Sequence, residues 1–301
     1  MKTAYISFTT IFFLGLLPIT IFAQQEPNQF SLSDTTVTVD LNNFLEEIRE
    51  ITIRYHDIQQ AKRDGYVLFG PDMPNMGEHY VSPVKAVSRD FNFNRPSVLC
   101  YLPVGDKHLL TGVAYTFPAA AGDPPPRLPL EEMNWHYHAG DLELEAHGIT
   151  ENNLLEKEPD KPRLAMLHAW IWSKNPDGIF TADHWGLSYM RLGLEIPSHA
   201  DPDASRALFL LFDGIEYYTR FVELAAAPDG KSLENIQSIL NHYSKKVELL
   251  ASSMKERQMV TDKDQDTLKS IWNEMWLKIK GVVSKGEWEK INTHLSNFHN
   301  H

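Results

Sequence analysis

The sequence predicts an α+β fold, with a β-containing N-terminal and middle region followed by an antiparallel helical bundle at the C-terminus. Two apolar runs, 97–103 and 109–117, flank a short polar segment, a pattern typical of a β-hairpin. Beyond residue 205, apolar residues recur every three or four positions, as they do along one face of a helix. Since each such helix has a single apolar stripe to bury, we expect the helices to pack on one another and on the β-containing region.

The N-terminus is typical of an exported protein. Residues 1–23 combine a basic residue near the start, an apolar run over 11–22 and the small residue Ala23, which together indicate a cleavable signal peptide. The run is too short to cross about 30 Å of hydrocarbon comfortably, although an uncleaved anchor is the alternative. Residues 24–40 are mostly polar and predict a flexible lead-in. We therefore expect a periplasmic or secreted protein with no membrane span after cleavage.

The charge balance narrows the expected partners. The chain has 40 Asp and Glu against 28 Lys and Arg, a formal net charge of −12. Such a surface repels phosphate backbones and anionic lipids, so nucleic acids and membrane surfaces are not expected partners. The expected partner is a small-molecule ligand or substrate.

Cys100 is the only cysteine, so an exported form of the chain has no intramolecular disulfide. It lies in the apolar run 98–102, where we expect a buried, inert thiol rather than a metal ligand or a nucleophile. The stability of the fold must then come from its apolar core.

Residues 41–200 are predicted to form the α+β domain. A first helix, capped by Asp40 or Asn42, has apolar residues at helical spacing and ends at Gly65. Pro- and Gly-containing loops and then the hairpin follow this helix.

Three segments after the hairpin complete the predicted domain. The Pro-rich stretch 119–129 lacks the backbone donors of a strand and separates the hairpin from the rest of the domain. Two further strands are expected, at 134–138 and 163–173.

Residues 205–301 are predicted to form the helical domain. One amphipathic helix is expected around 208–218, and Thr261 with Asp264 forms an acidic capping box that opens another. A short last helix is expected over 287–298.

The longest predicted helix carries a heptad seam that begins after Ser232 as N-cap. Its apolar residues alternate spacings of three and four without a slip: Leu233, Ile236, Leu240, Tyr243, Val247, Leu250 and Met254.

Four histidines of the middle region are the candidate metal ligands. His136 and His138 lie in one predicted strand, where alternation places them on one face about 6.6 Å apart, twice the strand rise. Both imidazoles can then approach one metal ion. His168, in the next predicted strand, is the expected third ligand, and His79, in a predicted loop, is the fourth.

This ligand set suits copper or zinc, with iron as a further option, whereas calcium and magnesium prefer oxygen ligands. Glu78 and Glu143 are the candidate catalytic acid or base near the metal. In the alternative interpretation, the histidines are structural and hydrogen-bonded among aromatic neighbours. For residues 141–147 the alternative to a role near the metal is an amphipathic strand in which Glu143 and His147 face solvent.

Aromatic residues gather in the same region and could line a pocket or fill a core. His168 is expected to share a strand face with two of them. The candidate pocket residues are Trp135, Tyr137, Trp170, Trp172 and Trp185.

The spacing of His136, His138, Glu143 and His168 partly resembles the motif set of the cupins. The glycines that open the first cupin motif are missing upstream, and so are the Pro and Gly that precede the late cupin histidine. The likeness implies a shared metal site for these four residues.

Two motifs resemble an uncharacterised family of secreted bacterial proteins. The first is Met76-Gly77-Glu78-His79-Tyr80, followed by a Pro-x-x-Leu-x-Tyr strand that begins at Pro96. The second is Leu167-His168-Ala169-Trp170, followed by an Asn-Pro-x-Gly-x-Phe segment that begins at Asn175. The resemblance covers about half of the mature chain and implies that His79 and His168 belong to one shared architecture. Ser82 stands where the family has Asn.

The sequence contains no phosphate-binding glycine loop, no Gly-x-Ser-x-Gly elbow and no cysteine-based zinc spacing. We therefore expect an exported protein with a histidine-rich transition-metal site, of the oxidoreductase or hydrolase class if it is an enzyme. The alternative is a periplasmic or secreted protein that binds a small ligand or a partner without catalysis, with the aromatic cluster as its pocket and the heptad helix as a docking surface.

Overall fold

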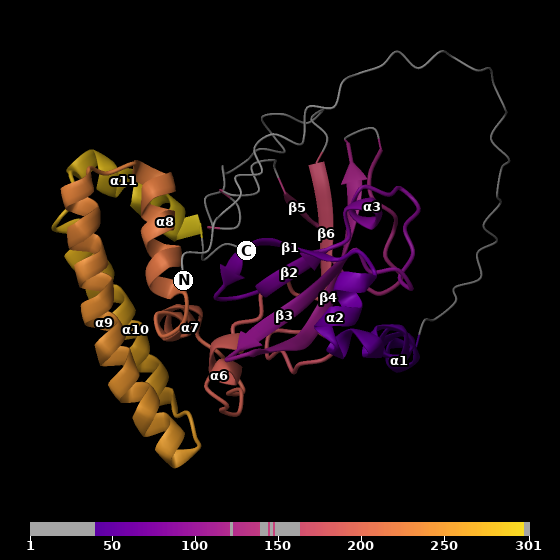
Figure 1. Cartoon of the computed structure of the whole chain (residues 1–301), viewed down its shortest axis with the longest axis horizontal. Coiled ribbons are helices and arrows are strands. Elements are labelled where there is room, and N and C mark those ends of the chain that lie inside the picture. The colour runs from indigo at the N-terminus through magenta and orange to yellow at the C-terminus, as the bar shows by residue number, and fades with distance from the viewer. Residues whose placement is uncertain (1–39, 121–122, 139–143, 145–146, 148–162, 298–301) are drawn as a thin grey trace, which may run out of the picture. The chain divides into compact units, whose positions relative to one another are not determined.

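Six strands form one antiparallel sheet in the order β1-β2-β3-β4-β6-β5 (Figure 1). The computed structural model describes residues 40–120, 123–138, 144, 147 and 163–297. The predicted signal peptide, the lead-in up to residue 39 and Glu143 lie outside the described residues. The strands are β1 (Val67–Met73), β2 (Gly77–Val81), β3 (Val98–Val104), β4 (Lys107–Ala119), β5 (His136–His138) and β6 (Arg163–Ala169).

The predicted α+β fold is confirmed, and so is the predicted hairpin, which is β3 and β4 joined through Gly105 and Asp106. Strands β1 and β2 were not expected, because their Pro and Gly residues indicate loops. The backbone accommodates these residues at β1, where the register shifts between Phe69 and Met73 and Gly70 adopts a positive φ of 77°. His79 consequently lies in a strand and not in the predicted loop.

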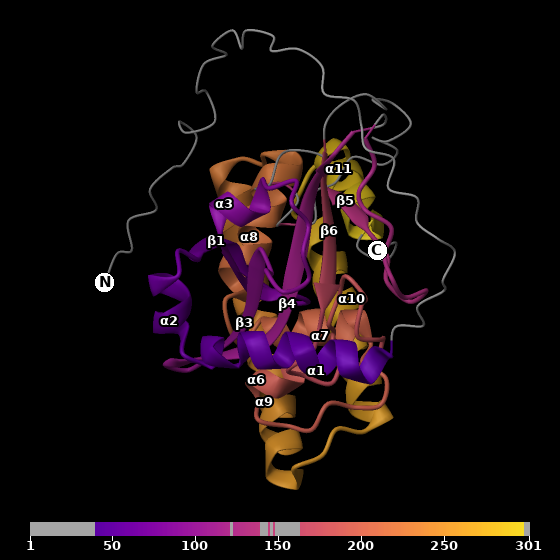
Figure 2. The same ribbon diagram turned by 90° about the vertical axis from the view of Figure 1, so that its right-hand side faces the viewer.

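Three helical segments lie on one face of the sheet, and Figure 2 shows α1 crossing the strands. The Asp40 carboxylate caps the first helix, as one of the two predicted alternatives, by accepting the backbone N–H of Asn42. The single helix expected up to Gly65 is interrupted at Asp57, whose side chain caps a new helix. The segments are α1 (Leu41–Thr52), η1 (Ile53–His56) and α2 (Ile58–Arg63).

The apolar core under these helices joins Leu45 and Ile48 of α1 to Leu99 and Val113 of the sheet. On the opposite face a much smaller cluster contains Cys100. The two faces are thus unequal, and the second one carries the histidines.

The C-terminal helices pack against one another, α9 beside α10 and α8 beside α11 (Figure 1). Thr261 and Asp264 form the predicted capping box at the start of α10. Helix α9 begins earlier than expected, with Asp229 and not Ser232 as N-cap. The remaining helices are α3 (Pro83–Ala86), α6 (Leu187–Arg191), α7 (Pro202–Phe209), α8 (Gly214–Ala226), α9 (Gly230–Arg257), α10 (Asp262–Lys280) and α11 (Lys285–Asn297).

The single helix predicted around 208–218 is instead two helices, because α7 ends at Phe209 and α8 starts at Gly214. The close approach at this corner requires a glycine. A Cβ on Gly214 would lie 2.5 Å from the carbonyl oxygen of Phe209. None of the helices in the described part of the chain is long and apolar enough to span a bilayer.

The heptad seam of α9 is occupied by the chain itself. Ile236, Leu240, Tyr243, Val247 and Met254 are buried in the large core of the helical region. These five seam positions therefore offer no free apolar surface to a partner, contrary to the docking role that the alternative interpretation gave to this helix.

A buried ion pair links the sheet to the helical region. The Arg191 guanidinium of α6 donates to both carboxylate oxygens of Asp72 on β1, each at 2.6 Å. Arg191 also donates to the carbonyl oxygen of Pro103 at the end of β3. Both side chains of the pair are almost fully buried, so removing one partner leaves a buried charge without compensation.

We expect Asp72→Ala to lower the free energy of unfolding by about 3–5 kcal/mol, measured by denaturant titration. The matched control is Asp90→Ala, which removes the exposed Asp90–Arg95 ion pair and should change stability little. Equal effects of the two substitutions would contradict this account of the pair.

Candidate metal centre

His79 and Cys100 lie side by side on the sheet. His79 of β2 pairs with Cys100 of β3, which pairs in turn with Gly112 of β4. Side chains of directly paired residues project from the same face of an antiparallel sheet, with Cβ atoms about 4.5–5.5 Å apart. The imidazole and the thiol therefore share the face opposite α1.

His168 reaches the same place from the far side of β4. It pairs with Ala114, and in a flat sheet three strand spacings would hold the backbones of β2 and β6 about 14 Å apart. The Nε2 atoms of His79 and His168 are nevertheless only 3.2 Å apart. The sheet must therefore curl towards this face, and the register shift after Cys100 is a site where β4 can bend.

These three residues form a buried group with the geometry of a metal site. One nitrogen from each histidine and the Cys100 sulfur all lie within 4.8 Å of one another. The exposed fractions are 6% for His79, 0% for Cys100 and 1% for His168. Two nitrogens bound to one tetrahedral zinc ion at about 2.0–2.1 Å are separated by about 3.3–3.4 Å. The observed 3.2 Å separation is close to that value, so an ion can be held with little movement.

The protonation states of the imidazoles favour metal binding. Burial, with a smaller contribution from His138, lowers the pKa of His79 to about 4. Burial and the neighbouring imidazoles of His136, His79 and His138 also hold the pKa of His168 well below its usual value. Both rings are therefore neutral at neutral pH, which is the form that binds metals.

The Cys100 thiol and Nδ1 of His168 are the two parts of the group whose protonation or hydrogen bonding is unusual. Burial raises the pKa of the Cys100 thiol, so the thiol stays protonated until a metal displaces the proton. The Nδ1 atom of His168 has no hydrogen-bond partner within the described part of the chain. The Nε2 atom of His168 contacts only the second imidazole, and a bound ion would take the place of that contact while leaving Nδ1 unchanged.

His136 and His138 lie next to the group but outside it. The His136 ring stacks on His168 with centroids 5.2 Å apart and an interplanar angle of 6°. The His138 ring lies 5.1 Å from that of His136. The four predicted histidines are thus brought into one cluster, in which His79 and His168 are closest to Cys100.

Trp170 supports the other side of His168. The two rings are nearly parallel, with centroids 5.5 Å apart, and the Trp170 indole N–H donates to the carbonyl oxygen of Thr181. Gly112 makes room for this tryptophan, because a Cβ there would lie 2.7 Å from the oxygen of Ala169 and 3.0 Å from Cε3 of Trp170. The position of His168 therefore depends on a glycine in the neighbouring strand.

We expect Gly112→Ala to displace Trp170 and to lower the free energy of unfolding by about 1–3 kcal/mol, as in other overpacked cores. Denaturant titration measures the loss. Gly230→Ala is the matched control, since nothing lies within 4 Å of an added Cβ there, and it should be neutral. If Gly112→Ala were as stable as the control, β4 would accommodate the added methyl group without loss of stability, contrary to this account.

His184 is buried beside Trp170 but takes no part in the group. Its ring lies edge-on to Trp170 at 5.0 Å, and its Nε2 is 3.0 Å from Oγ of Ser173. That hydroxyl donates to the carbonyl oxygen of Thr111, which leaves it to accept from His184. This arrangement is the reverse of the one that activates a serine nucleophile.

Burial lowers the pKa of His184 to about 4, below an ordinary value of about 6.5. Between these two values the unfolded chain takes up a proton that the folded protein excludes, so stability falls as the pH is lowered. We expect this residue alone to contribute a loss of about 3 kcal/mol from pH 6.5 to pH 4.

The measurement is the free energy of unfolding at several pH values, for the parent protein and for His184→Gln. The variant should show a shallower decline over that interval, while His79 continues to contribute in the same direction. Identical slopes would rule out His184 as a source of the acid sensitivity.

Glu78, one of the two predicted acid or base residues, is not at the group. Glu78 adjoins His79 in β2 and therefore points to the opposite face, where its Oε2 lies 3.1 Å from Nε2 of His108. Burial and the nearby Asp72 carboxylate raise the pKa of Glu78 to about 7. Glu143 lies outside the described residues. The structure thus places Glu78 away from the proposed metal ligands.

Three further expectations need correction. Strand β6 ends at Ala169, and Trp172 packs with the opposite face, where its indole N–H donates to Thr52. Tyr137 is an exposed residue at the sheet edge. His147, which the alternative interpretation of 141–147 placed in solvent, is buried and stacks on Tyr217 at 5.0 Å.

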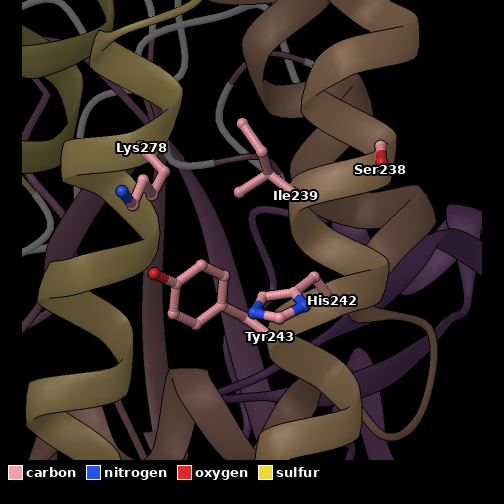
Figure 3. A pocket seen from close by; sticks show the side chains of 5 residues that line it. All are labelled: Ser238, Ile239, His242, Tyr243 and Lys278. Carbon is pink, nitrogen blue, oxygen red and sulfur yellow. The ribbon is translucent and has the colours of Figure 1, made fainter.

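Two hollows of the described structure differ in their position relative to the histidine cluster. The first, of about 370 Å³, is lined by Trp135, Trp185 and His136, which makes it the neighbour of the histidine cluster. The second lies between α9 and α10 and is shown in Figure 3, where Tyr243 points from α9 towards the helix of Lys278. This second hollow shares no residue with the histidine cluster.

No family model matches the chain. Comparison with curated proteins and with solved structures also gave no match. The resemblance of its motifs to a secreted bacterial family stays a prediction, and any functional assignment rests on the geometry of the residues themselves.

Cys100 is the candidate metal ligand that sequence reasoning missed. It is buried, as expected, but it is also within ligand distance of two histidines. A pairing of β2 with β3 that sets His79 opposite Cys100 would have identified it. The sequence did not predict that pairing, because the segment that forms β2 was not recognised as a strand.

Proposed function

We propose that this is an exported protein that binds one transition-metal ion, copper or zinc, through His79, Cys100 and His168. The observation that carries the proposal is the 3.2 Å separation of two buried imidazole nitrogens that have a thiol within 4.8 Å. The export component rests on residues 1–23 alone.

The donor set supports these two metals over others. Thiolate and imidazole are soft or borderline ligands that suit copper and zinc, whereas calcium and magnesium require oxygen donors. The thioethers of Met76 and Met166 pack against the small cluster that contains Cys100, and soft sulfur favours copper in particular. Iron is less well matched, because non-haem iron sites commonly include a carboxylate ligand and the described group contains none.

The arrangement leaves room for chemistry. Three protein ligands fill three positions of a tetrahedral ion, which is the pattern of catalytic and not of structural zinc sites. His136, stacked on His168, also lines the adjoining hollow, so a small molecule in the hollow would lie close to the metal. A bound ion with an open position supplies Lewis-acid or redox chemistry, which supports a metal-dependent oxidoreductase or hydrolase. The alternative is ligand binding without turnover.

The decisive measurement is the metal content of the purified protein after loading and removal of free metal. We expect about one equivalent of copper or zinc in the parent protein, and less than a tenth in His79→Gln and His168→Gln. Losing a direct ligand should weaken binding by more than about 100-fold, since losing an outer hydrogen-bond partner already costs 10–100-fold. Cys100→Ser should in addition abolish the thiolate-to-metal absorption of the cobalt- or copper-loaded protein.

The matched control is His242→Gln, which changes an exposed histidine on α9 and should keep the full equivalent. His136→Gln tests whether the stacked His136 ring is itself a ligand. If it is, this variant loses metal to the same extent as His168→Gln. Less than a tenth of an equivalent in the parent protein, or full retention in His168→Gln, would remove the proposal.

A further inference from the structure

The hollow beside the histidine cluster has the size of a small-molecule site. Its volume of about 370 Å³ is within the range of about 300–1,000 Å³ that is usual for ligand pockets. It is formed by the segments before and within β5, by the loop after β6 and by the start of α7. Three segments distant in sequence, 132–136, 177–185 and 199–202, thus converge on one space.

Carboxylates dominate its polar lining. Glu132, Asp177 and Asp183 contribute acidic groups, His136 and His199 contribute imidazoles, and no lysine or arginine is among the described residues that line it. Asp183 is buried and accepts a hydrogen bond from Asn75, which fixes the orientation of its carboxylate. A ligand anion would meet repulsion here, while a cation would be attracted. The net charge of −12 acts in the same direction at longer range.

Aromatic rings form the apolar part of the walls. Trp135, Phe180 and Trp185 line the hollow, and tryptophan is the best ring for binding a cation or a flat apolar body. Trp185 already holds the Arg206 guanidinium 4.4 Å from its ring centroid, and Asp203 pairs with that guanidinium. Trp135 is held in place by donating its indole N–H to the carbonyl oxygen of Pro126.

From the combination of aromatic walls and carboxylates we infer that this hollow is the binding site of a small organic cation, an amine attached to a flat apolar body. The inference goes beyond metal binding and does not require it, because none of the carboxylates belongs to the proposed ligand group. His136 is shared between the hollow and the histidine cluster, so a bound amine would lie next to the metal.

The test uses tryptamine and indole-3-propionate, which share an aromatic body and differ in charge. Calorimetric titration of the metal-free, full-length mature protein should show binding of tryptamine and at least tenfold weaker binding of indole-3-propionate. Asp177→Asn, which removes an exposed carboxylate of the hollow, should weaken tryptamine binding about fivefold, as expected for one exposed ion pair. Glu248→Gln, an exposed acid on α9, is the matched control and should change nothing.

A charge reversal makes the test independent of small losses in stability. Asp177→Lys should shift the preference from tryptamine towards indole-3-propionate. Absence of tryptamine binding at about 5 mM, equal binding of the two probes, or no effect of Asp177→Asn would overturn the inference. Since the titration is made without metal, its outcome is separate from that of the metal measurement. Repeating it on cobalt-loaded protein shows whether the amine perturbs the metal spectrum.

Discussion

The contact between His79 and His168 is the constraint on which the rest of the site depends. These residues lie on strands separated by two others, yet their imidazole nitrogens are 3.2 Å apart. This is feasible because the paired positions between them, Cys100, Gly112 and Ala114, carry small side chains or none. Larger residues there would fill the space above the middle strands and keep the rings apart.

Burying poorly satisfied imidazoles is unfavourable, so other parts of the fold must offset the cost. Two large apolar cores do this, one between α1 and the sheet and one within the helical region. The Asp72–Arg191 pair holds β1 against α6, next to the strand that carries His79. The histidine face can therefore be polar and thinly covered by apolar residues without loss of the fold.

The histidine cluster and the acidic hollow are connected through one residue. His136 stacks on His168 on one side and lines the hollow on the other. Electrostatics match this arrangement, because neutral imidazoles and carboxylates both attract cations, whether metal ions or organic amines. The Glu78–His108 contact lies on the other face of the sheet and belongs to neither.

Local patterns in the sequence determined the long C-terminal helices, the β3–β4 hairpin, the Thr261 capping box and the clustering of His136 with His138. These features depend on neighbours within a few residues, so periodicity and turn chemistry suffice to predict them. Only the tertiary structure decided that Cys100 joins His79 and His168, that Trp172 faces away and that the seam of α9 is already filled. Those outcomes follow from strand register and from the curl of the sheet. A shift of one residue in register would move every side chain of β2 to the opposite face, and no local pattern encodes that choice.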